Sequence, residues 1–264
     1  MVKMVLIAFL AVFIVMLVLW LIQLKSGNAG IVDIAWSYNF GIIAIVYYLY
    51  GSGFEPRKML IAAMVVVWSL RLGMYLFMRV MGHYKEEDSR YKQLREEWKK
   101  NLDLKFFLFF QFQAVLNVIL SIPFLLMVMN DRPGITVLEW AGLCIWIIAV
   151  TGEGIADYQL KLFKKNPANK GKVCDRGLWY YSRHPNYFFE WMIWIAYFVA
   201  ALSSPYGWIS IICPLLMSWF LFKVTGIPMT EEQAVRSKGQ AYIDYQNSTS
   251  VFVPWFKKTT GRSF

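Results

Sequence analysis

The apolar residues of this chain come in blocks of about 20, the length of helix that crosses a bilayer, and the charged residues gather between them. This pattern predicts an all-α, polytopic membrane protein built as a seven-transmembrane-helix bundle. The first block is too long for a cleavable signal peptide, and Lys25 follows it instead of a small-residue cleavage motif. The predicted spans are residues 4–24, 31–51, 59–81, 106–129, 137–157, 184–203 and 206–224.

Two polar segments outside the spans are expected to form short cytosolic amphipathic helices. Between residues 86 and 105, Tyr91, Leu94 and Trp98 recur at helical spacing among mixed charges. In residues 230–247, Thr230 is expected to cap a helix whose first turn is acidic. The sequence has no repeat and no linker long enough to separate domains, so residues 1–264 are interpreted as a single membrane domain.

Composition and charge agree with this picture and orient the bundle. The chain is 58% hydrophobic and 17% charged, whereas soluble domains average about 45–50% and about 25%. Most of the 27 Lys and Arg residues lie in residues 83–105, in residues 161–183 and in the tail from residue 223 onward. The positive-inside rule then places the N-terminus outside and the C-terminus in the cytosol. We expect an integral, multi-pass protein of a bacterial inner membrane rather than of an endoplasmic reticulum.

The net charge of +10 reflects this topology, so no nucleic acid is expected as a partner. The three cysteines lack CxxC spacing, which argues against a disulfide framework and against a zinc site. With only two histidines, the sequence also predicts no metal centre.

Polar side chains within or at the mouths of the spans are costly in lipid and usually face the bundle interior, so they are functional candidates. Several of them recur one helical turn apart. These candidates are Asp33, Tyr38, Arg71, Tyr75, Glu153, Asp157, Lys164, Asn186 and Glu190. A structural role is the alternative, with Arg71 as a packing partner of Asp33 and Asn117 as a helix–helix contact.

A second group of donors stands at the start of the sixth span, next to seven cationic side chains. It consists of Tyr180, Tyr181, Arg183, His184, Asn186 and Tyr187. Such a group suits an anionic cofactor that carries phosphates and an aromatic ring. An anionic lipid headgroup is the alternative ligand.

The segment Arg176–Glu190, with Arg-His-Pro-Asn-Tyr at 183–187, resembles the steroid 5-alpha-reductase superfamily, in particular its bacterial branch known as domain of unknown function 1295. Further agreement comes from Val-Asp-Ile-Ala-Trp at 32–36, Trp-Ser-Leu-Arg-Leu-Gly at 68–73, Asp-Ser-Arg-Tyr at 88–91 and Thr-Ser-Val-Phe-Val-Pro-Trp at 249–255. The resemblance implies an NADPH-dependent oxidoreductase acting on CH–CH groups, with its cofactor-binding part in residues 137–258. The implied substrate is a lipophilic small molecule, steroid-like or an enone, with an activated C=C bond. Membrane lipids are the other expected partners.

Carried over by position, the family's cofactor contacts fall on acidic, amide, basic and aromatic side chains, next to the donors of the second group. They are Glu153, Asp157, Asn186, Glu190, Lys164, Lys172, Tyr181 and Tyr187, with Arg183 and His184 beside them. The chain departs from the family at Trp68, which stands where a span-three tyrosine protonates the substrate, because indole is not a general acid. The catalytic candidates are therefore Tyr38 and Tyr75, oriented by Asp33 or Arg71.

Two other functions stay open. A methyltransferase that uses S-adenosylmethionine, of the isoprenylcysteine carboxyl methyltransferase type, is supported by the motif at 183–187 and by Glu231 and Glu232 later in the sequence. A non-catalytic lipid-binding membrane protein is supported by Trp68 at the position of the catalytic tyrosine.

Overall fold

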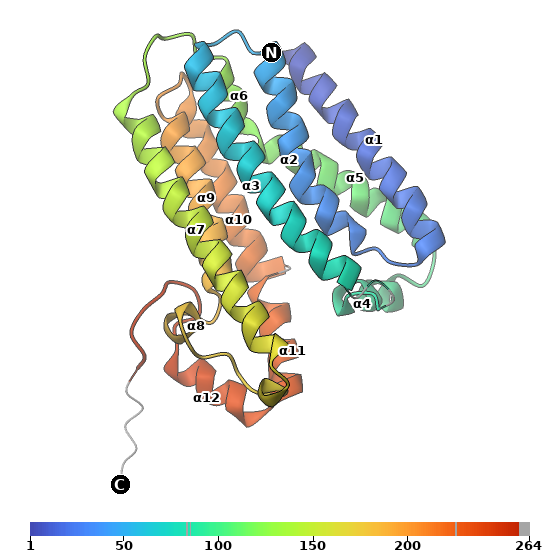
Figure 1. The fold of residues 1–264 in the computed structure, drawn as a ribbon. Helices are drawn as coiled ribbons and strands as arrows, with labels where there is room; N and C mark the ends of the chain where they lie inside the picture. Colours follow the sequence, from blue (N-terminus) through green and yellow to red (C-terminus); the bar gives the residue numbers. More distant parts are fainter. Residues whose placement is uncertain (83, 85, 225, 259–264) are drawn as a thin grey trace. The chain divides into compact units, whose positions relative to one another are not determined.

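The computed structural model describes residues 1–82, 84, 86–224 and 226–258, and in this part of the chain it is all-helical (Figure 1). Six of the described helices are long and apolar enough to cross a membrane, in agreement with the predicted multi-pass membrane protein. They are α1 (Val2–Ser26), α2 (Ile31–Tyr50), α3 (Glu55–Gly82), α5 (Leu102–Leu120), α7 (Val137–Lys165) and the run Gly207–Lys238.

The remaining elements are shorter, and several subdivide the run Gly207–Lys238. They are α4 (Ser89–Trp98), α6 (Ile122–Val128), η1 (Pro167–Asn169), α8 (Leu178–Tyr181), α9 (Pro185–Ala201), η2 (Gly207–Ile211), α10 (Ile212–Trp219), η3 (Phe220–Val224), α11 (Ile227–Lys238) and α12 (Gln240–Ser248). The predicted sixth span corresponds to α9, which has 17 residues and is not one of the six. Among the described residues, helix length and composition thus account for six of the seven expected spans.

Two predicted spans differ from the helices observed. The span predicted at 106–129 is divided at Ser121, where α6 begins with Pro123 in its first turn. Proline lacks a backbone N–H and is tolerated in the first turn of a helix but not in its interior, so it starts a new helix here. The span predicted at 137–157 continues as α7 to Lys165. The apolar sequence indicates only the part of a helix that lies in lipid, and the helix itself extends beyond that part.

The C-terminal amphipathic segment also differs from the prediction. The helix α11 begins at Ile227, so Thr230 is not its cap, and the Thr230 hydroxyl instead donates to the carbonyl of Gly226 at 2.9 Å. Gly239 adopts a φ of 58° between α11 and α12. Because side-chain-bearing residues rarely adopt such a φ, this glycine divides the single helix that was expected.

The chain forms two compact units. The N-terminal unit comprises Met1–Trp140 together with Ala200–Ser210, and the C-terminal unit comprises Ala141–Val199 together with Ile211–Phe264. The boundaries fall within α7, α9 and η2 rather than in a flexible segment, so no linker in the sequence indicates the division.

Close packing of α2 against α3 forms the centre of the N-terminal unit. The hydroxyls of Ser37 and Ser69 each donate to the other residue's carbonyl, at 2.9 and 2.8 Å. Beside them, Trp68 is fully buried and its ring lies 5.3 Å from the ring of Phe40. Small residues that allow helix backbones to approach, with hydrogen bonds across the contact, are typical of membrane helices. Trp68 is therefore a core residue of this contact.

Polar contacts also attach α2 to α5, and they support the helix-contact interpretation of Asn117. The amide of Asn117 donates to the carbonyl of Trp36 at 3.1 Å, and its side-chain oxygen accepts from Asn39 at 3.1 Å. A hydrogen bond of this kind holds two helices together where water is absent.

A buried ion pair organises one end of the N-terminal unit. The side chains of Arg57 on α3 and Glu139 in the first turn of α7 are both fully buried and form a salt bridge. The same guanidinium donates to three carbonyls of the intervening loop, those of Asn130, Arg132 and Gly134, at 2.7 to 3.0 Å. Each N–H direction of Arg57 is thus used, as a buried guanidinium requires.

Candidate functional site

Asp33, a predicted catalytic residue near the start of α2, lies at the centre of an ion cluster in the N-terminal unit. Its carboxylate accepts from Arg90 at 2.8 Å and from Arg79 at 3.2 Å. The hydroxyl of Tyr91 donates to the same carboxylate at 2.6 Å. Because Arg90 and Tyr91 belong to α4 and Arg79 to the end of α3, Asp33 fastens α4 to α2 and α3. This positioning role is not evident from the sequence alone.

The cluster extends to Asp88, which caps the N-terminus of α4. Its carboxylate accepts from the backbone N–H of Arg90 and from the Nε of Arg90, both at 3.0 Å. Burial alone would raise the pKa of Asp88, but the hydrogen bonds and the charge of Arg90 hold that pKa below its ordinary value. Arg90 is therefore held between two carboxyl groups, and α4 has a defined start.

The other catalytic candidates are half-buried side chains of α2 and α3: Tyr38, Arg71 and Tyr75. The ring of Tyr38 lies directly against Gly73 of α3, where an added Cβ would be only 2.6 Å from it. The absence of a side chain at Gly73 thus sets the position of the Tyr38 ring within the helix pair.

In the C-terminal unit, α7 and α9 bring together four of the predicted cofactor residues. Glu153 and Asp157 on α7 are 3% and 5% exposed. The amide of Asn186, in the first turn of α9, donates to Asp157 at 3.3 Å. One turn later on α9, Glu190 accepts from the indole of Trp194 at 3.2 Å. Two helices therefore carry a group of carboxyl and amide side chains, of which Glu153 and Asp157 are buried while those on α9 are half-buried. We call it the α7–α9 polar group.

Aromatic donors that sequence analysis missed complete this group. The indole of Trp146 on α7 donates to the hydroxyl of Tyr197 on α9 at 3.2 Å, and Tyr197 is fully buried. Glu190, Trp194 and Tyr197 are spaced i, i+4 and i+7, so one face of α9 carries all three. That spacing is visible in the sequence and indicates that aromatic side chains continue the helix face on which Glu190 lies.

The approach of α7 to α9 depends on Gly152. A Cβ at this position would lie 2.5 Å from the ring of Phe189. We expect Gly152→Ala to destabilise the protein by about 1–3 kcal/mol, because the ring must move out of a packed contact. The measurement is thermal unfolding of the purified protein in detergent. The matched control is Gly154→Ala, two residues away with nothing within 4 Å of the added Cβ; equal unfolding temperatures for the two variants would contradict the close contact.

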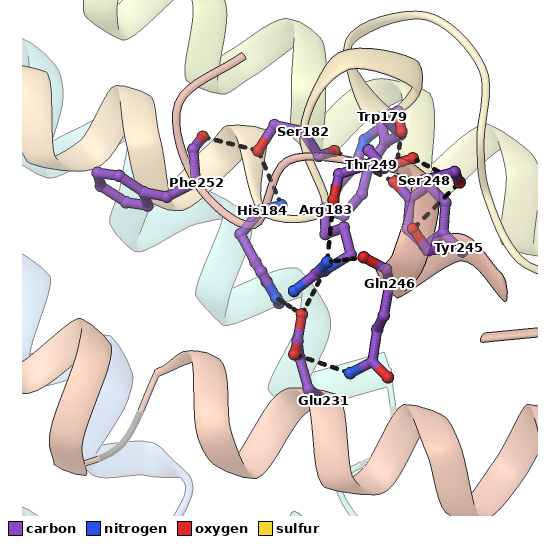
Figure 2. Close-up of polar contacts among 10 residues, drawn as sticks. All are labelled: Trp179, Ser182, Arg183, His184, Glu231, Tyr245, Gln246, Ser248, Thr249 and Phe252. Atoms are coloured by element: carbon purple, nitrogen blue, oxygen red, sulfur yellow. Dashed lines mark hydrogen bonds and ion pairs between the residues drawn. The ribbon is translucent and has the colours of Figure 1, made fainter. Parts of the chain in front are cut away.

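A second constellation of the C-terminal unit is centred on Glu231 of α11 (Figure 2). Its carboxylate accepts from the Nε of Arg183 at 2.6 Å and from the amide of Gln246 at 2.9 Å. The Nε2 of His184 lies 3.2 Å from the same carboxylate. The motif at 183–187 and the acidic pair at 231–232 are therefore joined by direct contact. We call these four side chains the Glu231 cluster.

Backbone contacts hold the chain around this cluster. The Nη1 of Arg183 donates to the carbonyls of Gln246 and Thr249 at 2.6 and 2.9 Å. A parallel bridge joins Ser182 to Ser250, and the backbone N–H of Arg183 donates to the carbonyl of Ser250 at 2.9 Å. The segment that follows α12 is thus fixed alongside the segment that precedes α9 (Figure 2).

Tyr245 of α12 closes the same arrangement. Its hydroxyl donates to the carbonyls of Trp179 and Ser182. Burial raises the pKa of Tyr245, so it remains a protonated donor at neutral pH. The side chain therefore ties α12 to the turn between α8 and α9.

The remaining predicted cofactor residues lie elsewhere on the C-terminal unit. The ring of Tyr187 stacks on His184, with centroids 5.3 Å apart and planes 6° apart. Lys164, Lys172 and Tyr181 are exposed. The acidic and amide candidates thus form one group, the Arg-His-Pro motif forms a second, and the basic candidates lie at the surface.

Comparison with known proteins gives two matches over most of the chain and one short match. A family model described as "Protein of unknown function (DUF1295)" matches residues 19–249. An uncharacterized protein of Schizosaccharomyces pombe is 24% identical over 271 residues, which covers 90% of this chain and 76% of that protein. A probable O-methyltransferase of Ustilaginoidea virens is 44% identical over 46 residues, 17% of this chain and 16% of that protein. No solved structure matches.

Proposed function

The chain belongs to the DUF1295 family, and we propose that it is a membrane reductase of the steroid 5-alpha-reductase kind, which uses NADPH to reduce an activated C=C bond in a lipophilic substrate. The observation that carries this proposal is the α7–α9 polar group, in which Asn186 contacts Asp157 close to a second buried carboxyl group, Glu153. The proposal includes a seventh span formed by α9, an N-terminus outside and a C-terminus in the cytosol of a bacterium.

The chemistry of the α7–α9 polar group fits a nicotinamide cofactor. Carboxylates accept hydrogen bonds from ribose hydroxyls and from a carboxamide N–H₂, and an asparagine amide both donates and accepts. Buried ionisable groups in membrane helices are retained chiefly for function, because their burial in lipid is costly. The exposed Lys164 and Lys172 supply cations for phosphate groups.

When bound, NADPH supplies the hydride. In the proposed mechanism Asp157 and Asn186 would hold the nicotinamide end of the cofactor, and Glu190 would orient it. Tyr38 and Tyr75 donate hydrogen bonds to the substrate carbonyl and so stabilise negative charge that develops on its oxygen. Arg71 orients these hydroxyls, whereas the Asp33 carboxylate serves the contacts with α4. The apolar helices exclude water from the reacting groups.

Ligand-linked stabilisation of the detergent-purified protein tests the proposal. A ligand at 100 times its dissociation constant stabilises by about 2.7 kcal/mol, so NADPH is expected to raise the unfolding temperature. We expect Asn186→Ala to weaken binding at least tenfold, since a hydrogen bond to a charged partner contributes about 1.5–3 kcal/mol. The matched control is Asn247→Ala, an exposed position of α12 that is expected to bind like wild type. No shift with NADPH and a shift with S-adenosylmethionine would overturn the reductase proposal.

A second candidate function is methyl transfer from S-adenosylmethionine to a lipid or a lipidated cysteine. Two observations favour it: the 46-residue match to a probable O-methyltransferase, and the contact of Arg183 and His184 with Glu231. The S-adenosylmethionine arm of the same experiment tests this candidate. A non-catalytic lipid-binding role agrees with the buried Trp68; it predicts cofactor binding without turnover on a panel of enones.

A further inference from the structure

A pocket of about 550 Å³ opens in the C-terminal unit beside the Glu231 cluster. One wall is the side chain of Arg183, and Gln246 of α12 and the segment that follows α12 form the rest, including Val253, Trp255, Phe256 and Lys258. None of the lining residues is acidic, and two are cationic. The last acidic residue of the sequence is Asp244, whereas Lys257, Lys258 and Arg262 follow it. The charge of this pocket is therefore complementary to an anion.

Backbone hydrogen bonds and the Arg183 side chain hold the walls of the pocket. The N–H of Trp255 donates to the carbonyl of Tyr181 at 2.9 Å, and the N–H of Lys258 donates to the carbonyl of Ser248 at 2.8 Å. Arg183 uses Nε and Nη1 for Glu231 and two carbonyls, and no described residue accepts from its Nη2. Donor capacity for an anion thus remains on a guanidinium that is already positioned.

The pocket also borders an exposed apolar surface, which selects the kind of anion. Val253, Trp255 and Phe256 are 52%, 69% and 73% exposed. Aromatic rings with this exposure concentrate at membrane–water interfaces, and Lys and Arg beside them attract anionic lipids. Arg183 stands two residues before α9 begins, at the mouth of a predicted span. A soluble anion makes no use of the exposed apolar side chains, whereas the glycerol and upper acyl region of a lipid covers them.

From this arrangement, we propose that the pocket binds the phosphate of an anionic membrane phospholipid, with Arg183 and Lys258 as cationic contacts and Trp255 and Phe256 against the glycerol backbone. This site is distinct from the α7–α9 polar group, and its Arg183 wall also belongs to the Glu231 cluster. Bound lipid would brace the segment after α12, whose Thr249 carbonyl accepts from Arg183 of the Glu231 cluster.

Native mass spectrometry of the full chain, supplied with equal amounts of phosphatidylglycerol and phosphatidylcholine, tests the proposal. Wild type is expected to retain phosphatidylglycerol preferentially. A basic residue near an anionic surface contributes about fivefold in affinity, so Lys258→Gln is expected to lower retention about fivefold. Trp255→Ala is expected to lower it to a similar degree. The matched control is Lys170→Gln, an exposed lysine of the same unit that does not line the pocket, and it is expected to retain lipid like wild type.

Four outcomes would overturn the lipid site. Equal retention of the two lipids by wild type excludes selection of the anionic headgroup. Equal loss in Lys258→Gln and Lys170→Gln indicates unspecific surface charge. Displacement of phosphatidylglycerol by millimolar glycerol 3-phosphate indicates a site for soluble phosphate, and displacement by NADPH assigns the pocket to the nucleotide. Both test positions are exposed, so the variants are expected to unfold at the temperature of wild type, which is checked in the same samples.

Discussion

Replacing Arg57 by glutamine is expected to lower the free energy of unfolding by about 3–5 kcal/mol, the cost of removing one partner from a fully buried ion pair. The variant leaves the Glu139 carboxylate buried, with the backbone N–H of Thr136 at 2.7 Å as its remaining described donor. The loop carbonyls that Arg57 serves also lose that donor. The measurement is unfolding of the full chain in detergent, followed by circular dichroism.

A matched control and a double-variant cycle separate this effect from a general loss of positive charge. Arg132→Gln removes an exposed arginine from the same loop and is expected to change stability by less than about 0.5 kcal/mol. The double variant Arg57→Gln with Glu139→Gln leaves no uncompensated charge, so it is expected to be less destabilised than the sum of the single variants by at least about 1 kcal/mol. Simple additivity would show that the two side chains do not act as a pair.

Arg57 also illustrates what the sequence alone does not predict. It stands before the apolar part of its span, so the charge pattern identifies it only as a cation on the outer side. Its partner follows 82 residues later, and nothing local selects Glu139 over other carboxylates. Asp33 is a similar case: its charge within a span marked it as functional, yet its partners on α4 are 57 and 58 residues away. Local sequence patterns identify charged residues whose burial is unfavourable, but they do not identify the partners of those residues.

The α7–α9 polar group was easier to predict from the sequence than the partners of Arg57 and Asp33. Helical spacing predicted that Glu153 and Asp157 lie one turn apart on one helix face, and that Asn186 and Glu190 do the same on another helix. The structure brings Asp157 and Asn186 into contact. Spacing within one helix is a local property, so it survives folding unchanged. The close approach that Gly152 permits was not predicted, because a glycine in an apolar helix has many roles and only the facing ring of Phe189 identifies this one.

The apolar blocks predicted the helices, except where the end of an apolar block and the end of a helix fall at different residues. Apolar sequence predicted the positions of α1, α2 and α3 within a few residues. It did not predict that α7 would continue past residue 157, or that Pro123 would start a new helix within the fourth span. Hydrophobicity indicates which residues of a helix face lipid, whereas proline and glycine indicate where the backbone begins or ends a helix. At these positions the two do not coincide.

The Glu231 cluster leads to the second prediction, because one carboxylate serves three side chains there. Replacing Glu231 by glutamine is expected to destabilise the protein by about 2–3 kcal/mol, within the range for hydrogen bonds to charged groups. Arg183 keeps its two carbonyl acceptors but loses its counter-charge, and its side chain is only 11% exposed. The measurement is unfolding in detergent, with the same protocol for Glu231→Gln and Glu232→Gln, and it compares the loss of stability in the two variants.

Glu232 is the control that the chain itself offers, since it is adjacent in sequence and differs in environment. Its side chain is 64% exposed and pairs with Arg236 one turn away, a surface contact of at most about 0.5 kcal/mol. If both variants unfold like wild type, the contacts of Glu231 do not hold the segment after α12 in place. If Glu231→Gln alone is destabilised, any loss of cofactor or lipid binding in that variant must be compared at temperatures where both proteins are folded. A binding defect that persists there extends the role of Glu231 from fastening Arg183 and His184 to shaping the ligand site beside them.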